Sequence, residues 1–164
     1  MDRMKSEDER LLMALIKGAR RSDRELAKVL KVSQPTVTRR RTKLENEGYV
    51  KEYTLIPDLS KMGYDFVAMT FLSFTEERPE LFDKAREWTR NRSSVIYATN
   101  GEGMGMNSVM ISIHKDYASY SKLISELRRD WQPNLKDIQT FMVSLSRPEI
   151  LIKPISFRYL GGNL

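Results

Sequence analysis

Basic residues concentrate in one short stretch of the chain. Between Arg10 and Lys43 lie eleven Lys and Arg residues and only two acids, Asp23 and Glu25, so these 34 residues carry a net charge of +9. The 164-residue chain carries +6 in total, and the remainder therefore sums to −3. Such segregation suits a protein whose one face meets a polyanion. The alternative interpretation of a basic cluster is a solvated helical surface.

The side chains that follow Ser33 have the chemistry of nucleic-acid recognition. Arginine forks grip guanine edges or phosphates, and threonines reach bases or thymine methyl groups. At about 100° per residue, a helix here turns Val37 and Leu44 to one apolar face and leaves a small, cationic, hydroxyl-bearing surface opposite. The residues predicted to bind DNA are Ser33, Gln34, Pro35, Thr36, Thr38, Arg39, Arg40 and Lys43.

Two helices are expected to support this segment. Ser6 with Glu9 and Ser22 with Glu25 have the spacing of capping boxes, which begin helices. Leucines, valine and isoleucine recur after each box at helical spacing. The first helix is predicted to end near Gly18.

The third helix completes a helix-turn-helix. Ser33 is predicted to cap it, Pro35 lies in its first turn, where a missing N–H costs nothing, and Gly48 ends it. The alternation over residues 49–55 predicts a strand, which would serve as a wing. A winged helix-turn-helix inserts its recognition helix into the major groove, so this half of the chain predicts double-stranded DNA as a partner.

Composition excludes several other classes of protein. Cysteine is absent, which removes disulfides, cysteinyl zinc and thiol chemistry. A single histidine, His114, argues against His-rich metal sites and Ser-His-Asp triads, and we expect it to be structural or superficial. We therefore predict no catalytic residue, metal or cofactor. No apolar run reaches the roughly 18 residues of a membrane span, and the first residues lack a signal-peptide core, so the expected location is cytoplasmic.

The second half predicts a ferredoxin-like domain. Apolar alternation and helical periodicity follow one another as strand, helix, strand, strand, helix, strand, with Trp88 and Trp131 on apolar helix faces. An antiparallel sheet covered by helices on one face leaves the other face bare, and a symmetric dimer would cover it. The six elements are expected at 66–74, 78–91, 94–99, 107–114, after Asp116, and 138–145.

The N-terminal motifs resemble those of the Lrp/AsnC family of transcriptional regulators. The resemblance implies an α+β protein, with a winged helix-turn-helix followed by a ferredoxin-like βαββαβ domain that forms dimers, and often tetramers or octamers. It also implies small effectors, commonly amino acids, bound near the loop between the second and third strands. The matching residues are Asp8–Leu12, Leu15, Arg20, Glu25–Ala27, Val32–Val37, Arg39, Arg40, Leu44, Glu45 and Gly48–Val50.

The effector loop departs from the family pattern. The predicted effector-binding residues are Asn100, Gly101, Glu102 and Gly103. The family places an aspartate soon after a glycine, whereas this loop has only Glu102 to accept an ammonium group, out of register. The glycines do not match a phosphate-binding loop, because their spacing differs and a strand follows instead of a helix.

Two further features of the sequence lead to expectations, the first from the family pattern and the second from the apolar residues of the tail. Arg41 stands where the family usually has a branched aliphatic residue, and its stem can pack while the guanidinium contacts a phosphate or an acid. The apolar tail is expected to dock on its own sheet or on a partner subunit. The predicted organisation is a DNA-binding domain over 1–55, a linker over 56–65, an effector-binding and oligomerisation domain over 66–147, and the tail over 148–164.

Three functions remain open on these grounds. The leading hypothesis is a sequence-specific transcriptional regulator that forms homodimers and senses an amino acid or a related metabolite. Siroheme decarboxylases share the two-domain plan, although a lone histidine and an outward basic helix suit a tetrapyrrole with many carboxylates poorly. The third hypothesis is a non-specific, chromatin-like DNA binder, which competition between a promoter and bulk DNA would distinguish.

Overall fold

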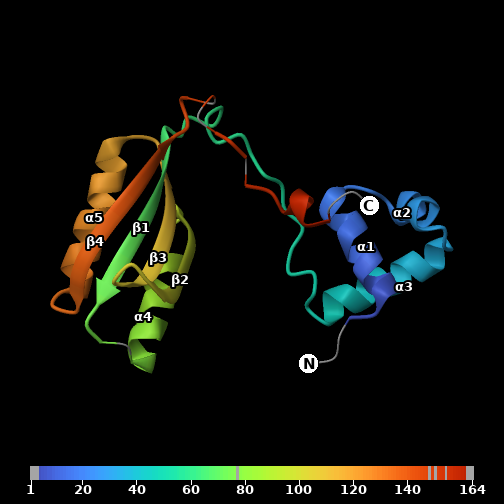
Figure 1. The fold of residues 1–164 in the computed structure, drawn as a ribbon, viewed down its shortest axis with the longest axis horizontal. Coiled ribbons are helices and arrows are strands. Elements are labelled where there is room, and N and C mark those ends of the chain that lie inside the picture. The colour runs from blue at the N-terminus through green and yellow to red at the C-terminus, as the bar shows by residue number, and fades with distance from the viewer. Residues whose placement is uncertain (1–3, 77, 148, 150, 154, 162–164) are drawn as a thin grey trace. The chain divides into compact units, whose positions relative to one another are not determined.

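The computed structural model describes residues 4–76, 78–147, 149, 151–153 and 155–161. It divides into two compact units, one built from residues 1–57 with 153–164 and the other from residues 58–152. Figure 1 shows the first unit as helical and the second as a sheet with two helices. Among the described residues, no helix is long and apolar enough to cross a membrane.

The helical unit contains three helices around a small leucine-rich core. These are α1 (Ser6–Lys17), α2 (Asp23–Leu30) and α3 (Gln34–Asn46). Leu11, Leu26, Val37 and Leu44 are completely buried, and they pack with Leu15 and two alanines. Each buried aliphatic side chain contributes about 1.5–3 kcal/mol relative to exposure. The inward positions predicted for α3, Val37 and Leu44, are thus confirmed.

The helix ends agree with the predicted signals in two cases of three. Ser22 and Glu25 form a reciprocal capping box on α2, and Ser33 accepts a hydrogen bond from the Thr36 amide at the start of α3. The prediction of a box at Ser6 is wrong: α1 begins at Ser6, and its N-cap is Lys5, without a side-chain bond. Instead, the acids in the first turn of α1 interact favourably with the positive end of the helix dipole.

The predicted wing strand over 49–55 does not form. The chain turns at Gly48, whose φ of +74° suits a residue without a Cβ, and then runs irregularly to residue 58. An alternating pattern is not sufficient for a strand, because a strand needs a partner ladder. Within the described part of the helical unit, no second strand offers one.

The C-terminal segment belongs to the helical unit. Its 3₁₀ helix η2 (Phe157–Gly161) lies against α1, and the Arg158 guanidinium donates to the Lys17 carbonyl at 3.5 Å. The expectation that the tail docks on its own sheet is therefore wrong, and docking on a partner subunit stays a prediction. Phe157 and Leu160 remain exposed, so this contact buries little apolar surface.

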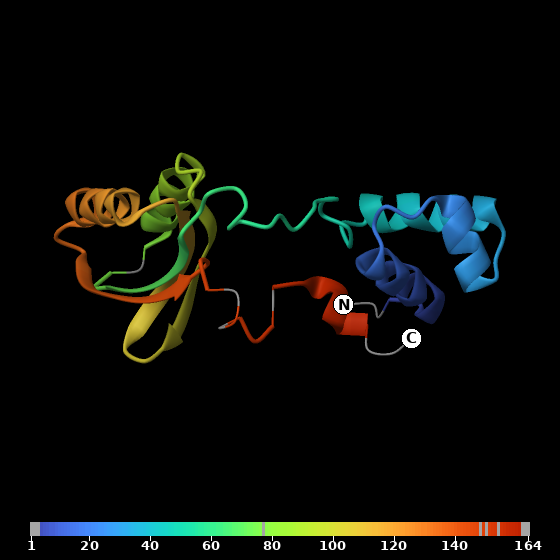
Figure 2. The ribbon, with the colours of Figure 1, turned by 90° about the horizontal axis from the view of Figure 1, so that it is seen from above.

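The second unit has the predicted order of elements. Its strands β1 (Phe66–Phe74), β2 (Val95–Gly103), β3 (Met106–His114) and β4 (Leu135–Ser144) form an antiparallel sheet in the order β2-β3-β1-β4. Helices α4 (Pro79–Arg90) and α5 (Tyr117–Trp131) cover one face, as Figure 2 shows. This is the ferredoxin-like arrangement.

The covered face of the sheet holds the second core. Leu72, Met110 and Leu127 are nearly inaccessible, and Trp88 and Trp131 pack with them, as predicted for both tryptophans. His114 is buried, stacks on Phe66, and its Nε2 lies 2.9 Å from the Ser112 hydroxyl. Burial lowers the pKa of His114, so the neutral ring is favoured.

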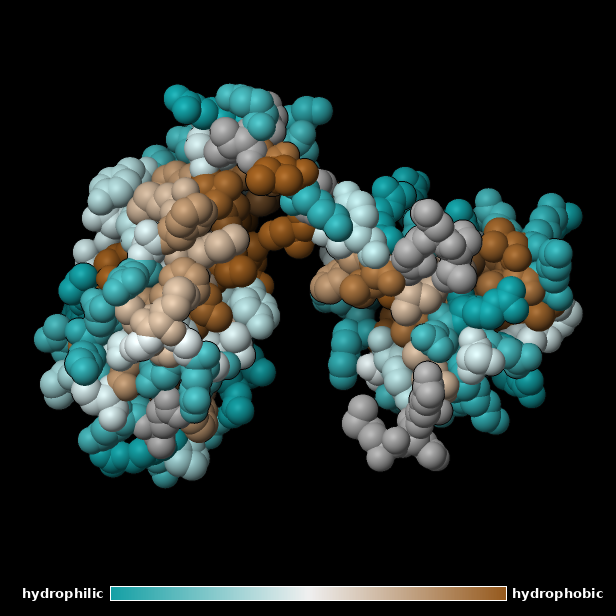
Figure 3. Space-filling view, in the orientation of Figure 1, coloured by the Kyte–Doolittle hydropathy of each residue, from teal (hydrophilic) through white to brown (hydrophobic). Residues whose placement is uncertain are grey.

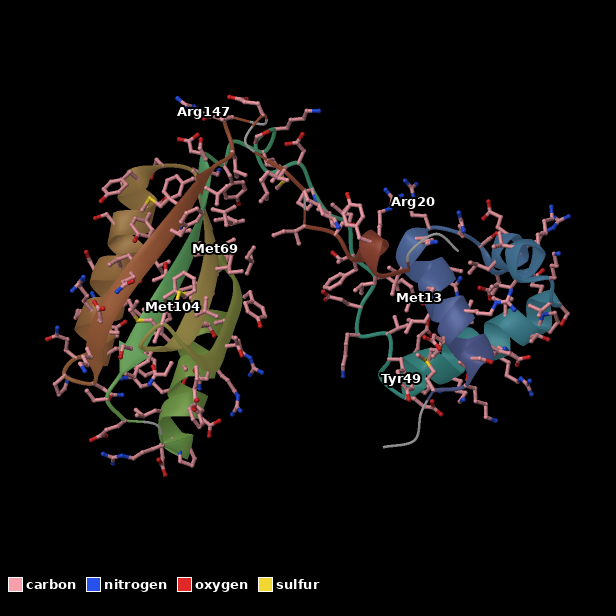
Figure 4. All side chains as sticks on the ribbon, viewed as in Figure 1. Met13, Arg20, Tyr49, Met69, Met104 and Arg147 are labelled. Carbon is pink, nitrogen blue, oxygen red and sulfur yellow. The ribbon has the colours of Figure 1, made fainter. Side chains whose placement is uncertain are left out.

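The opposite face of the sheet is apolar, and none of the described helices of its unit covers it. Successive side chains of a strand alternate between faces, so Met69 of β1 shares this face with its cross-strand partners Ile111 and Phe141. Phe141 is 63% exposed, as is more than half of Tyr97, which pairs with Ile111. Figure 3 shows apolar side chains gathered over this unit, and Figure 4 labels Met69.

Candidate functional site

The N-terminal half of α3 is the candidate nucleic-acid interface. The Ser33 hydroxyl accepts from the Thr36 amide at 3.3 Å and lies 2.7 Å from the Thr36 hydroxyl, which fixes the first turn. Val37 and Leu44 hold the helix against α1 and α2. The buried stripe fixes the rotation of the helix, so the residues opposite it must face outward.

Arg39 is the central cation of the outward face. It is exposed, and within the described residues it makes no ion pair or side-chain hydrogen bond. Gln34 and Pro35 at the start of the helix are exposed as well. Thr42, one turn after Arg39, shares this face and is also exposed, although the predicted interface does not include it. A guanidinium without an internal partner keeps its donors for an external acceptor.

Arg40 and Lys43 face the acids of α1 instead. Lys43 Nζ lies 2.7 Å from Asp8 Oδ2, and the Arg40 guanidinium pairs with Glu7 and lies 4.0 Å from Asp8. The hydrogen bond to Asp8 raises the pKa of Lys43 above its usual value. Both cations were predicted to bind DNA, and the charges that hold them lie more than 30 residues earlier in the chain.

On the other side of α3, Asp23 contacts both Thr38 and Arg41. The Thr38 hydroxyl lies 2.6 Å from Asp23 Oδ2, and Arg41 pairs with Oδ1 at 2.8 Å. Arg41 also donates to the Arg21 carbonyl at 3.2 Å, and its guanidinium lies 6.0 Å from the Tyr53 ring. The unusual arginine therefore packs along α3 and pairs with an acid, one of the two roles expected for it.

Additional exposed cations surround the turn that precedes α2 and continue along α2. Arg20 projects outward after α1 in Figure 4, and Arg24, Lys28 and Lys31 are exposed. The sequence signal for them was the charge segregation, but the predicted interface was confined to α3. A helix-turn-helix presses its first helix against the DNA backbone, where such side chains meet phosphates.

All four predicted effector residues, Asn100–Gly103, lie on strand β2 and not in the expected loop, because β2 extends to Gly103. Only Met104 and Gly105 form the turn of the hairpin, with φ of 54° and 73°, as in a two-residue turn of the type that hairpins favour. Gly101, Glu102 and Gly103 are exposed on the strand. Asn100 differs from these three residues because it lines a cavity of about 410 Å³ between the sheet and its helices.

The described residues hold no cluster of three or more His, Cys, Asp or Glu side chains suited to a metal ion. The observed groups on α3 are donors on an exposed helical surface, which is the requirement for binding an anionic partner.

Comparisons with known proteins agree with this architecture. The model of the AsnC-type helix-turn-helix domain matches residues 6–45. The HTH-type transcriptional regulator PH0061 of Pyrococcus horikoshii is 27% identical over 84% of this chain and 90% of its own. HTH-type transcriptional regulator LrpA of Pyrococcus abyssi is 30% identical over 112 residues, which cover 68% of this chain and 78% of LrpA.

Solved structures extend the likeness to both units. The crystal structure of PH0061 superimposes with a TM-score of 0.75, at 26% identity, and covers 87% of this chain and 94% of its own. Transcriptional regulator NMB0573 of Neisseria meningitidis, solved as an L-Met complex, has a TM-score of 0.74 at 17% identity, over 86% and 90% of the two chains. The chain belongs to the Lrp/AsnC family of transcriptional regulators, and its helix-turn-helix lies in α2 and α3.

Proposed function

We propose that this regulator reads double-stranded DNA with the outward face of α3. The observation that carries the proposal is Arg39, exposed at the centre of that face and without an internal partner among the described residues. Gln34 and Thr36 precede it within the same helix and have the donors and acceptors that base edges require. Pro35 and Ser33 shape the entry of the helix into the groove.

Arg40, Lys43 and Thr38 have a different part in this proposal. Each touches a carboxylate of α1 or α2, so each arrives at DNA already oriented. Lys43 and Arg40 can direct their remaining N–H donors to phosphate oxygens while they keep these contacts, because an ammonium has three donors and a guanidinium five. These side chains position the protein on the backbone, while Arg39 and Gln34 discriminate between sequences.

The active form is proposed to be a homodimer formed through the bare face of the sheet. An exposed apolar sheet face of this kind is typical of a protein–protein interface. A two-fold axis would present two copies of α3 to major grooves one helical turn apart or a multiple of it, and the operator would be palindromic. Tetramers or octamers would follow from further contacts between dimers.

We also propose that the second unit senses an amino acid or a related small metabolite. The L-Met complex of NMB0573 supports this for a protein of the same fold. The residues Asn100, Gly101, Glu102 and Gly103 stay a prediction for that site. The chain is proposed to act in the cytoplasm as a regulator without catalysis, so neither siroheme decarboxylation nor non-specific DNA packaging is favoured.

One selection experiment tests the DNA proposal. Random duplexes are enriched on the purified protein, with and without a mixture of amino acids, and the enriched pool is sequenced. We expect a palindromic motif whose affinity exceeds that of bulk DNA by about three orders of magnitude or more. Enrichment of no motif would contradict sequence-specific regulation, and a motif unaffected by the mixture would contradict amino-acid sensing.

A further inference from the structure

The second unit contains a cavity of about 410 Å³ between the sheet and its helices. This volume lies in the range of about 300–1,000 Å³ that small-molecule sites occupy. Its walls come from strands β1, β2 and β3 and from α4 and α5, so one copy of the unit is sufficient to form it. The apolar lining includes Leu72, Phe74, Leu81, Met110 and Leu127.

Both tryptophans of the chain line this cavity. Trp88 donates its indole N–H to Asp130 at 2.9 Å and is therefore satisfied. Trp131 is only 5% exposed, and its Nε1 has no hydrogen-bond partner among the described residues. A buried donor without an acceptor is unfavourable, so packing against apolar neighbours, and not a hydrogen bond within the described residues, holds Trp131 in the wall of the cavity.

The polar side of the cavity has a cation with unused N–H donors. Arg86 of α4 lines it and pairs with Asp83, and both of these side chains are more than half exposed. A guanidinium has five donors, and an exposed i,i+3 pair is weak, so Arg86 can also bind a carboxylate. Asn100 adds an amide at the same cavity, whereas Asn107 is held by both of its hydrogen bonds to the Phe74 backbone.

We propose that this cavity binds a small carboxylate with a branched or aromatic apolar body. The body would lie between the tryptophans and the leucines, and the carboxylate would meet Arg86 and Asn100. The inference rests on the proposed sensing function and adds a site formed within one subunit, which shares only Asn100 with the effector residues predicted on β2. An amino acid and its 2-oxo acid share this chemistry, and the two are distinguished below.

The test uses the full chain and its own fluorescence. Four probes of one shape are titrated: L-leucine, 4-methyl-2-oxopentanoate, 4-methylpentanoate and the neutral 4-methylpentanamide. Because both tryptophans line the cavity, a bound acid must change the emission and raise the thermal midpoint. Absence of any response to the three acids at roughly 10 mM, a generous limit for ligands with so few atoms, would overturn the proposal.

Variants test whether the acids bind in the cavity and whether Arg86 binds their carboxylate. Ala85→Phe fills the cavity from α4 and is expected to abolish the fluorescence response. Arg86→Gln is expected to lower the affinity for the acids about ten-fold and to leave the affinity for the amide unchanged. Arg90→Gln on the same helix, exposed and outside the lining, is the matched control. Unaltered acid binding in either of the first two variants, or equal affinity of amide and acids, would overturn the site. Far-UV circular dichroism checks folding, and Arg86→Gln decides alone if Ala85→Phe does not fold.

The comparison of probes also identifies the source of the ligand. Stronger binding of leucine supports an amino-acid source, and stronger binding of the 2-oxo acid supports a keto-acid source. Operator binding by gel shift is measured on the same samples without probe. Operator binding without a probe response contradicts the cavity alone, whereas a probe response without operator binding contradicts the DNA proposal alone.

Discussion

Asp8 of α1 and Lys43 of α3 form an ion pair, with Nζ 2.7 Å from Oδ2, across 35 residues of sequence. Asp8 is 5% exposed and also lies 4.0 Å from the Arg40 guanidinium. A buried carboxylate between two cations ties the first helix to the third. The same pair keeps the Lys43 ammonium directed along one side of the proposed DNA interface.

Replacement of Asp8 should loosen this connection. Asp8→Asn keeps the shape but removes the charge, so we expect the free energy of unfolding to fall by about 1–2 kcal/mol. Urea denaturation monitored by circular dichroism measures it. Glu52→Gln, which removes a carboxylate at an exposed position outside the helices, is the control and should leave the midpoint unchanged. Equal midpoints for the two variants would contradict a structural role for the pair.

Arg39 should matter for DNA and little for stability. Arg39→Ala is expected to weaken operator binding by about 1–3 kcal/mol, because an exposed guanidinium loses base or phosphate contacts. Its thermal midpoint should match that of the wild type, since Arg39 has no internal partner among the described residues. Fluorescence anisotropy at several salt concentrations measures the affinity, with Arg90→Ala of α4 as the control. Unchanged affinity would refute α3 as the recognition helix.

Arg40→Ala should reduce both the affinity for the operator and the stability of the fold. The substitution removes a proposed phosphate contact and the pairing with Glu7 and Asp8. We expect weaker operator binding together with a small loss of stability, and a shallower dependence of affinity on salt, because one fewer counterion is released. A loss of stability with full affinity would assign Arg40 to the fold alone.

The buried His114 makes the sheet unit sensitive to acid. Burial lowers its pKa below the ordinary 6.5, and the nearby Asp116 opposes this only in part. The unfolded chain therefore binds the proton more readily than the folded one, so stability should decline as the pH falls from 6.5 toward the lower folded value. Thermal midpoints between about pH 7 and 5 measure the decline. His114→Gln should flatten this part of the profile, and an unchanged slope would contradict the assignment.

The bare face of the sheet should control assembly. Phe141→Glu places a charge among apolar side chains at a position that is 63% exposed in the single chain, so the fold should tolerate it while the dimer should not. Light scattering after size exclusion should report a monomer. Ser125→Glu on the exposed side of α5 adds the same charge elsewhere and should remain dimeric. A dimeric Phe141→Glu protein would place the interface on another surface.

The sequence by itself determined what depends on nearby residues. Hydrophobic periodicity located α1–α5 and the order of the four strands, and the capping signals at Ser22 and Ser33 began α2 and α3 where expected. The buried stripe of Val37 and Leu44 also fixed which side of α3 faces outward. These properties arise within a few residues, where backbone geometry and side-chain spacing suffice.

Only the tertiary structure decided which polar groups meet. Nothing in the local sequence places Glu7 and Asp8 against Arg40 and Lys43, because such pairs depend on how α1 crosses α3. The segment 49–55 has a strand pattern, yet a ladder requires a partner that the described part of its unit lacks. The cavity beneath the sheet likewise exists because packing of α4 and α5 leaves space between distant side chains, which no spacing along the chain encodes.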